Sequence, residues 1–284
     1  MKFRHSDPYQ LFGAILHRSR LGLQEAHRAA FKADSRCSEL QREEQFLGFE
    51  QSSYGPDLPF LRGDAHFAGT ERRSLEEIVA RRDEIWAEAQ AEDLFADQQA
   101  SILVLWADDA LRRFARGVLK RAPSFDKGYG VTYGCWPAGE VPIALTTMLR
   151  AATNTLRHVS EWDDNSALVF PYDDFKPKNK AEKSQLTEHQ RFEENNAEQS
   201  IQNIKILRRA FGIGVNERIR DIVSWRTLVA IDGYLGTHAP DYQRFENALV
   251  TAAREMADEA GPESRARLEA ELTRTWARAD AHLL

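Results

Sequence analysis

Apolar residues recur every three or four positions along most of this 284-residue chain, and stretches with the two-residue alternation of a strand are scarce. This spacing predicts amphipathic helices over residues 8–49, 74–122, 142–162, 201–211, 219–235, 241–260 and 262–282. Elements of one kind bury their apolar faces against one another. We therefore expect an all-α helical bundle.

Capping residues and prolines set the expected limits of these helices. Ser74 and Glu77 have the form of a capping box, and Pro123 ends the pattern that follows them. A break or kink is expected around Asp34-Ser35, and a break near Asp97.

Residues 124–139 hold four glycines among aromatic and β-branched residues, which predicts at most a short hairpin near residues 128–136. A phosphate-binding loop is disfavoured, because no lysine-serine or lysine-threonine pair follows the glycines. Pro142 then suits the first position of the next helix, where a backbone N–H is not needed.

Charge and composition narrow the classes of partner. The chain has 44 acidic and 38 basic side chains, a net charge of −6, whereas broad nucleic-acid grips are usually basic. Nucleic-acid contact would therefore be local. Cys37 and Cys135 lie far apart, which disfavours a disulfide framework or structural zinc. Without a secretory signal or a long apolar run, we expect a cytoplasmic protein with no membrane partner.

The segment 145–162 carries the most specific functional pattern. At about 100° per residue one face is apolar and should pack inward, and the opposite face is polar. The apolar face holds Leu145, Leu149, Ala152, Leu156 and Val159. The polar face holds Arg150, Asn154, Arg157 and Glu161, with His158 at its edge.

These polar groups are the ones that a metal-independent ribonuclease needs. An arginine, Arg157 or Arg150, can hold a phosphate through two hydrogen bonds, and His158 can exchange protons near neutral pH. Asn154 can orient the imidazole or the substrate. A base takes the proton of the RNA 2′-OH, the oxygen attacks phosphorus, and an acid protonates the leaving oxygen. Such a site needs no cofactor or metal and spares DNA.

The stretch Asn154-Thr155-Leu156-Arg157-His158, followed by Glu161-Trp162, resembles the motif helix of HEPN-domain proteins. The resemblance implies a ribonuclease of the kind found in toxin–antitoxin and phage-defence systems. It implies a homodimer whose two motif helices share one cleft, and a protein partner that inhibits or activates it. The motif normally carries an arginine directly before the polar residue, and Thr153 stands at that position here.

With this resemblance, the expected organisation is a HEPN-like helical core over residues 1–236, interrupted by a charged insertion at residues 163–200. A helical extension follows over residues 237–284. Candidate binding residues besides the catalytic set are Arg112, Arg113, Arg116 and Glu161. The three arginines could guide an RNA backbone, or they could simply be a solvated helix end.

Three alternatives stay open. The polar stripe could be an ordinary solvated face, with Arg157 and Glu161 forming an ion pair. Asp163, Asp174 and Lys176 have a spacing seen in metal-dependent nucleases. The whole chain could also be a non-catalytic helical adaptor or regulatory subunit.

Overall fold

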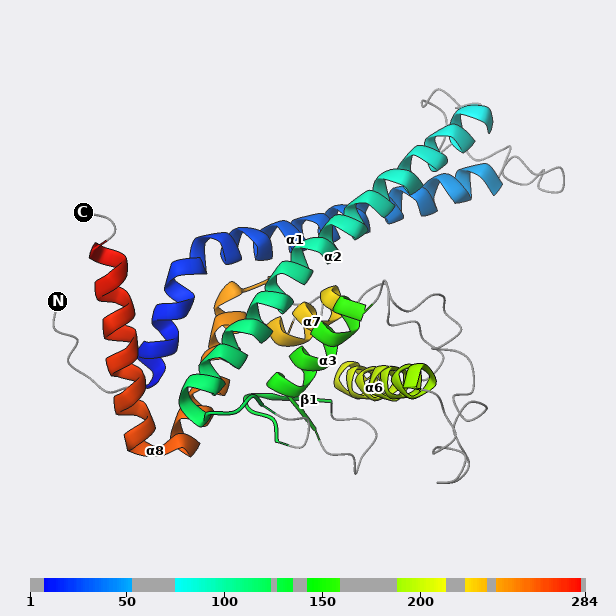
Figure 1. The fold of residues 1–284 in the computed structure, drawn as a ribbon. Helices are drawn as coiled ribbons and strands as arrows, with labels where there is room; N and C mark the ends of the chain where they lie inside the picture. The colour runs from blue at the N-terminus through cyan, green and yellow to red at the C-terminus, as the bar shows by residue number, and fades with distance from the viewer. Residues whose placement is uncertain are drawn as a thin grey trace. The chain divides into compact units, whose positions relative to one another are not determined.

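The computed structural model describes residues 8–52, 75–123, 127–134, 142–158, 188–212, 223–233 and 239–281. Over these residues it contains six helices and one pair of two-residue strands, so the all-α prediction is confirmed (Figure 1). The helices are α1 (Pro8–Ser52), α2 (Leu75–Leu119), α3 (Leu145–His158), α6 (Glu188–Phe211), α7 (Val223–Asp232) and α8 (Tyr242–Ala281). The strands are β1 (Thr132–Tyr133) and β2 (Ile143–Ala144).

The chain divides into two compact units. Residues 27–99 form one unit, which we call the arm, and residues 1–26 with residues 100–284 form the other, which we call the body. The predicted boundary at residue 236 stays a prediction. Within the body, α8 contacts both α3 and α7, so residues assigned to the C-terminal extension pack on the core.

The arm consists of the second part of α1 and the first part of α2. Its core is a set of buried apolar side chains from both helices: Cys37, Leu40, Leu47, Ile78, Ile85 and Ala89. On α2 the buried residues are seven and four positions apart, the spacing that keeps one face of a helix against its neighbour. The arm is thus a two-helix hairpin with a single buried seam.

The breaks expected in α1 and α2 are wrong. Helix α1 continues through Asp34 and Ser35, and the Ser35 hydroxyl donates a hydrogen bond of 2.9 Å to the Phe31 carbonyl within the helix. Helix α2 continues through Asp97, which lies between the buried residues Ala96 and Ala100. Apolar packing on both sides of Asp97 outweighs its weak helix propensity.

Helix α3 lies at the centre of the body and contacts α6, α7 and α8. Its predicted inward residues Leu145, Leu149 and Ala152 are fully buried. Helix α6 begins at Glu188, so residues 188–200 of the expected charged insertion are helical and continuous with the helix predicted over residues 201–211. Residues 159–187 lie outside the described part of the chain. Among the described residues, no helix is both long enough and apolar enough to cross a membrane.

The backbone around Lys120 and Pro142 determines where α2 ends and where α3 begins. Helix α2 ends at Leu119, and the next residue, Lys120, adopts a left-handed φ of 56° that stops the helix before Pro123. Pro142 does not begin a helix as predicted. Ile143 and Ala144 pair as β2 with β1, and α3 begins only at Leu145.

The hairpin predicted near residues 128–136 exists, and its second strand lies beyond that stretch. β1 and β2 are antiparallel, with Thr132 opposite Ala144 and Tyr133 opposite Ile143. Before β1, the chain is tied to the start of α3: the Tyr129 N–H donates to the Thr146 hydroxyl at 2.8 Å, and the Leu145 N–H donates to the Val131 carbonyl at 2.9 Å. The hairpin therefore fixes the beginning of α3.

Two glycines allow this hairpin to lie against the helices. Gly130 and Gly134 have left-handed φ values of 88° and 84°. A Cβ on Gly134 would come within 2.3 Å of the Arg209 carbonyl oxygen on α6, and one on Gly130 within 2.8 Å of the Ala252 Cβ on α8. These glycines therefore serve the close packing of the hairpin against α6 and α8.

Glu259 of α8 holds the same segment by its side chain. Its carboxylate accepts hydrogen bonds from the Tyr129 hydroxyl at 2.8 Å and from the Arg121 guanidinium at 2.7 Å, and the Lys127 ammonium lies 2.8 Å away. Hydrogen bonds from Lys127 and Tyr129, in that order, lower the pKa of Glu259 to about 2. A single carboxylate thus links α8 to the connection between α2 and the hairpin.

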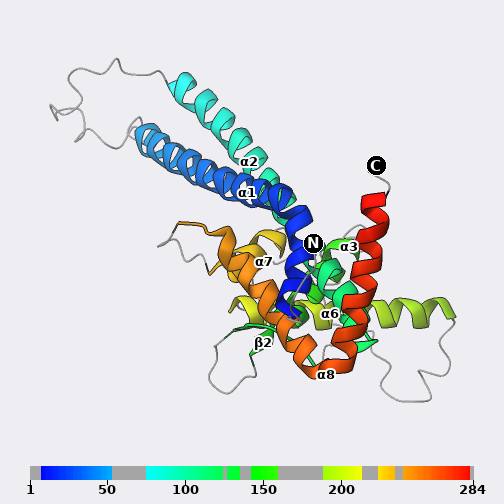
Figure 2. The ribbon, with the colours of Figure 1, turned by 90° about the vertical axis from the view of Figure 1, so that its left-hand side faces the viewer.

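Helix α8 contains the break that the sequence predicts between residues 260 and 262. Gly261 has a φ of 74° and a ψ of 175°, so two helical segments meet there at an angle (Figure 2). Pro262 follows at the first position of the second segment, where its missing N–H is tolerated. The expected pair of C-terminal helices is confirmed.

Replacing Gly134 with alanine should destabilise the protein by about 2 kcal/mol or more, because the left-handed backbone alone costs an L-residue roughly 1–2 kcal/mol. The clash with the Arg209 carbonyl adds to this cost. Gly22→Ala is the matched control, since Gly22 is helical and a Cβ there meets no atom within 4 Å. It should stabilise α1 by about 0.5–1 kcal/mol. Urea denaturation measures both, and equal stabilities would contradict the packing role.

The clamp at Glu259 should make stability depend on acid pH. The pKa of Glu259 lies below its ordinary value, so its contribution is complete above about pH 4.5 and is lost as pH falls toward 2. Glu259→Gln should therefore unfold at lower urea than the natural protein at pH 7, and the difference should shrink steadily between pH 4.5 and 2. Glu25→Gln, at an exposed position of α1, serves as the control. A difference that stays constant with pH would refute the ionic clamp.

Candidate functional site

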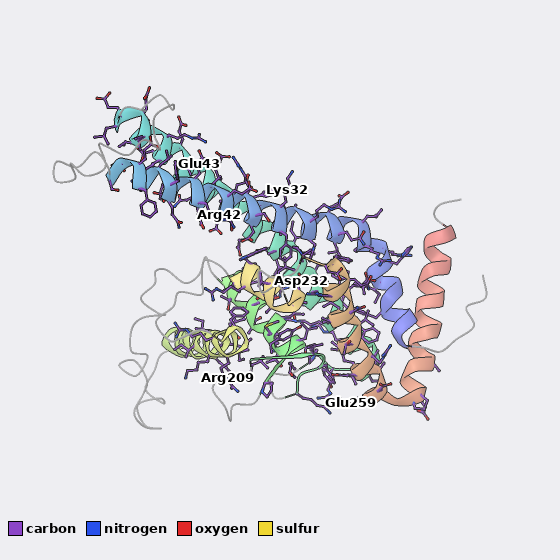
Figure 3. The ribbon with its side chains drawn as sticks, turned by 180° about the vertical axis from the view of Figure 1, so that it is seen from behind. Lys32, Arg42, Glu43, Arg209, Asp232 and Glu259 are labelled. Carbon is purple, nitrogen blue, oxygen red and sulfur yellow. The ribbon has the colours of Figure 1, made fainter. Side chains whose placement is uncertain are left out.

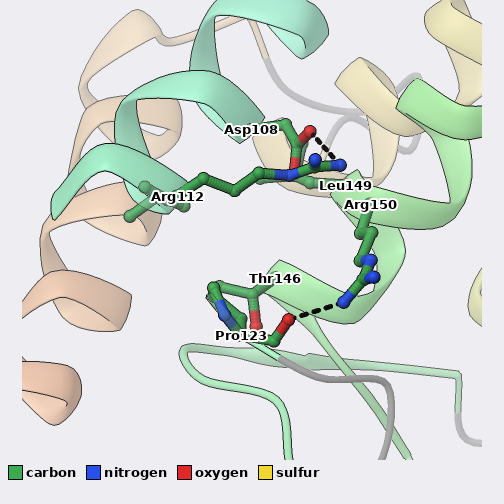
Figure 4. A pocket seen from close by; sticks show the side chains of 7 residues that line it. Asp108, Arg112, Pro123, Thr146, Leu149 and Arg150 are labelled. Carbon is green, nitrogen blue, oxygen red and sulfur yellow. Dashed lines mark hydrogen bonds and ion pairs between the residues drawn. The ribbon is translucent and has the colours of Figure 1, made fainter. Parts of the chain in front are cut away.

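The candidate site lies where the last turns of α2 meet α3 in the body (Figure 4). At its centre is Asp108 of α2, whose side chain is only 4% exposed. The Arg112 guanidinium, one turn along, donates a hydrogen bond of 3.0 Å from Nε to Oδ1, and its Nη2 lies 2.9 Å from Oδ2, within ion-pair distance. The carboxylate is thus neutralised by a charge-assisted contact within one helix.

Burial and neighbouring charges act on Asp108 in opposite directions. Burial raises the pKa of Asp108 above its ordinary value, and this effect exceeds the lowering that Arg112 produces. The Thr153 hydroxyl and the Arg157 guanidinium on α3 also lower the pKa of Asp108. Both α3 side chains therefore lie near the carboxylate, and two guanidiniums from different helices approach it.

Arg150 completes this set from the first half of α3. Its Nη1 donates a hydrogen bond of 2.6 Å to the Pro123 carbonyl, beyond the end of α2. Burial lowers the pKa of Arg150, the nearby Arg112 lowers it further, and Asp108 opposes them. Arg112 and Arg150 are thus like charges in one neighbourhood, as the close view shows (Figure 4).

A small cavity separates the two helices at this point. Its volume is about 10 Å³, enough for about one water molecule. Its lining combines apolar and charged side chains: Asp108, Leu111, Arg112, Pro123, Thr146, Leu149 and Arg150. A phosphate group does not fit into this space with Arg112 and Arg150 in place.

The structure places the predicted catalytic residues at different depths. Arg150 and Asn154 are half-buried, and Arg157 is exposed on the last turn of α3. His158 is the last residue of α3, and its side chain lies outside the described part of the structure, as does Glu161. Of the two arginines considered as phosphate clamp, Arg157 is therefore the one more exposed to solvent.

The predicted binding residues on α2 separate into two groups. Arg112 is committed to Asp108, and Arg113 pairs with Asp109 at 2.7 Å on the exposed surface. Arg116 is exposed in the last turn of α2. The structure thus brings Arg112 together with Arg150 and Arg157, whereas the pairing of Arg113 matches the alternative of a solvated helix face.

Sequence reasoning missed Asp108 and Thr146. Asp108 stands four residues before Arg112, a spacing that places the two side chains on one face of a helix and could have suggested the pair. Thr146 lines the cavity and accepts the Tyr129 N–H, and no local pattern identifies it. The alternative metal residues Asp163, Asp174 and Lys176 lie outside the described residues.

Neither a metal site nor a comparison with known proteins assigns a function to this cluster. Within the described ranges, no group of three histidine, cysteine, aspartate or glutamate side chains is placed to hold a metal ion. No protein-family description, curated protein or solved structure matches this chain.

Proposed function

We propose that this chain is a metal-independent, HEPN-like endoribonuclease whose reaction takes place at the C-terminal end of α3. The observation that carries this proposal is where α3 becomes accessible. Residues 145–149, 151–153 and 155 are buried, Asn154 is half-buried, and Arg157 is exposed directly before His158. A phosphate that approaches this helix meets Arg157 first and has an imidazole one residue away along the chain.

The surrounding charge supports phosphate binding. Asp108 supplies one negative charge near three guanidiniums, those of Arg112, Arg150 and Arg157, so this part of the body keeps an excess of positive charge. Such a local field attracts phosphate although the whole chain carries −6. This local positive charge agrees with the expectation that an acidic protein would contact nucleic acid over only a small surface.

The proposed reaction uses the side chains of α3 in separate roles. Arg157 binds the non-bridging oxygens of the scissile phosphate and stabilises the extra negative charge as the 2′-oxygen attacks. His158 takes the 2′-OH proton or protonates the leaving 5′-oxygen. Asn154, one turn earlier, orients the imidazole or the ribose. Arg150 stabilises the contact between α3 and the segment after α2 by its hydrogen bond to the Pro123 carbonyl.

The biological setting is proposed from the resemblance to HEPN-domain proteins. In it, the chain is a cytoplasmic homodimer in which a second copy brings another α3 to the same cleft. Its activity arrests growth or defends against phage, and a protein partner inhibits it until a trigger releases it. One histidine in each copy would then provide the acid and the base.

A second candidate function is that of a non-catalytic helical adaptor. It is favoured by large apolar side chains that the arm exposes, among them Phe49 at 76% and Trp86 at 61%. Exposed aromatic side chains often mark surfaces that bind other proteins. An adaptor would bind a defined protein and cut no RNA.

The role of His158 can be tested with purified protein and single-stranded RNA in EDTA. His158→Ala should lower the cleavage rate by about 10²–10⁴-fold, the usual contribution of a general acid or base. DNA of the same sequence should stay intact, because it lacks the 2′-OH. Thermal unfolding of the variant checks that it is folded. Unchanged cleavage by His158→Ala would exclude this mechanism, and activity that EDTA abolishes would point instead to Asp163, Asp174 and Lys176.

The two arginines of α3 should respond differently to substitution. Arg157→Ala should lower RNA cleavage by about 10²-fold or more, as does loss of a charge-stabilising group elsewhere. Its stability should change by about 0.5 kcal/mol or less, because the side chain is exposed. Arg150→Ala should lower stability by about 1–3 kcal/mol, since it removes the donor to the Pro123 carbonyl. Kinetics and urea denaturation separate the two roles, and the reverse pattern would assign the clamp to Arg150.

A further inference from the structure

The arm accounts for the net negative charge of the chain. Residues 27–99 hold nine lysines and arginines against 16 aspartates and glutamates, a net charge of −7, so the rest of the chain carries +1. Figure 3 labels three charged residues of this unit, Lys32, Arg42 and Glu43. The proposed ribonuclease site lies in the body and uses no residue of the arm.

Helix α2 presents a second apolar seam beside the one that packs on α1. The buried seam includes Ile78, Ile85 and Ala89. Leu75, Val79 and Trp86 lie within about 40° of one another on the helix surface, to one side of that seam. They are 45%, 39% and 61% exposed, and they are four and seven residues apart. This heptad-type spacing is what a helix presents to a neighbouring helix.

A groove runs between this second seam and α1. It has a volume of about 340 Å³ and is lined by Glu44, Gln51, Val79, Arg82, Asp83 and Trp86. Gly48 of α1 lies beside it, with open space except for the Arg82 guanidinium 3.8 Å from where a Cβ would be. Because Gly48 has no side chain, the α1 wall of the groove is not raised at this position.

Both sides of the buried seam carry arginines that are paired with carboxylates. On the far side, Arg36 pairs with Glu88 at 2.8 Å, and Arg81 pairs with Glu43 and Glu84 at 3.1 Å each. On the groove side, Arg82 is the cation that lines the groove, and it is bonded to Glu44. Acidic groups therefore exceed arginines on both sides, and on the groove side they lie beside the exposed apolar seam.

Two further carboxylates extend this acidic side along the arm. Asp93 lies within about 20° of Trp86 on the surface of α2, counted at 100° per residue. Asp34 of α1 is close enough to Asp93 that their repulsion, after burial, raises the pKa of Asp34. Like charges at this distance are costly, and a positively charged partner would relieve the repulsion.

We propose that this groove binds a positively charged amphipathic helix of a partner protein, which packs as a third helix along the arm. The apolar residues of the partner would cover Leu75, Val79 and Trp86, and its lysines or arginines would meet Asp83 and Asp93 at the edges. Trp86 would also contact the cationic side chains through its ring face. The proposal does not depend on ribonuclease activity, because no residue of α3 takes part.

The experiment uses the full chain and a fluorescein-labelled peptide of leucine and lysine patterned as an amphipathic helix, followed by fluorescence anisotropy. Trp86→Ala and Asp83→Lys should each weaken binding by about tenfold or more, the usual loss at a buried aromatic or charged anchor. Glu84→Lys makes the same charge change on the far side, where the side chain is 68% exposed, and should weaken binding by about twofold or less. A peptide of the same composition in scrambled order should bind at least about tenfold more weakly, because it presents no continuous apolar face.

Three results would overturn the proposal. The first is no binding of the patterned peptide, and the second is equal loss of binding in Asp83→Lys and Glu84→Lys, which would indicate unspecific charge attraction. The third is a dimer in analytical ultracentrifugation that Trp86→Ala dissociates, because the groove would then be covered by a second copy of the chain. Circular dichroism confirms that the exposed substitutions leave the helices intact.

Discussion

The burial of α3 is the constraint on which the body depends. Helices α6, α7 and α8 all contact it, and only its final turn and a few half-buried side chains approach solvent. A helix surrounded in this way can carry reactive groups at its end but not along its length. The backbone of Tyr129 and Val131, before β1, fixes the other end of α3 by hydrogen bonds. The position of α3 therefore does not depend on the candidate catalytic residues.

The sequence predicts the helices of this chain well because their apolar spacing extends over many turns. Gly261 and Pro262 predict the break in α8 correctly, since the backbone itself favours a stop there. Asp34, Ser35 and Asp97 mislead, because weak helix formers break a helix only where packing does not hold it. Buried apolar residues continue past these positions, with Cys37 and Leu40 after Ser35 and with Ala96 and Ala100 on either side of Asp97.

The arrangement around Asp108 is harder to predict because it depends on contacts between segments distant in sequence. Arg150 and Arg157 are identified from the polar stripe of one helix, whereas their common neighbour belongs to α2. The bond from Arg150 to Pro123 joins residues 27 positions apart, and no periodicity signals it. Local patterns thus find the helix that carries a site, and tertiary contacts decide which of its side chains solvent reaches.

Thr153 is the departure from the motif that α3 resembles, and its surroundings give a physical reason. Its side chain is fully buried near Asp108, in a place where an unpaired guanidinium would be costly. A guanidinium nevertheless reaches this neighbourhood from α2, where Arg112 donates a hydrogen bond to Asp108 Oδ1 and lies within ion-pair distance of Oδ2. The short threonine leaves room for that pair. In the proposed enzyme, positive charge would therefore be shared between Arg112, which orders the helix contact, and Arg157, which faces the substrate.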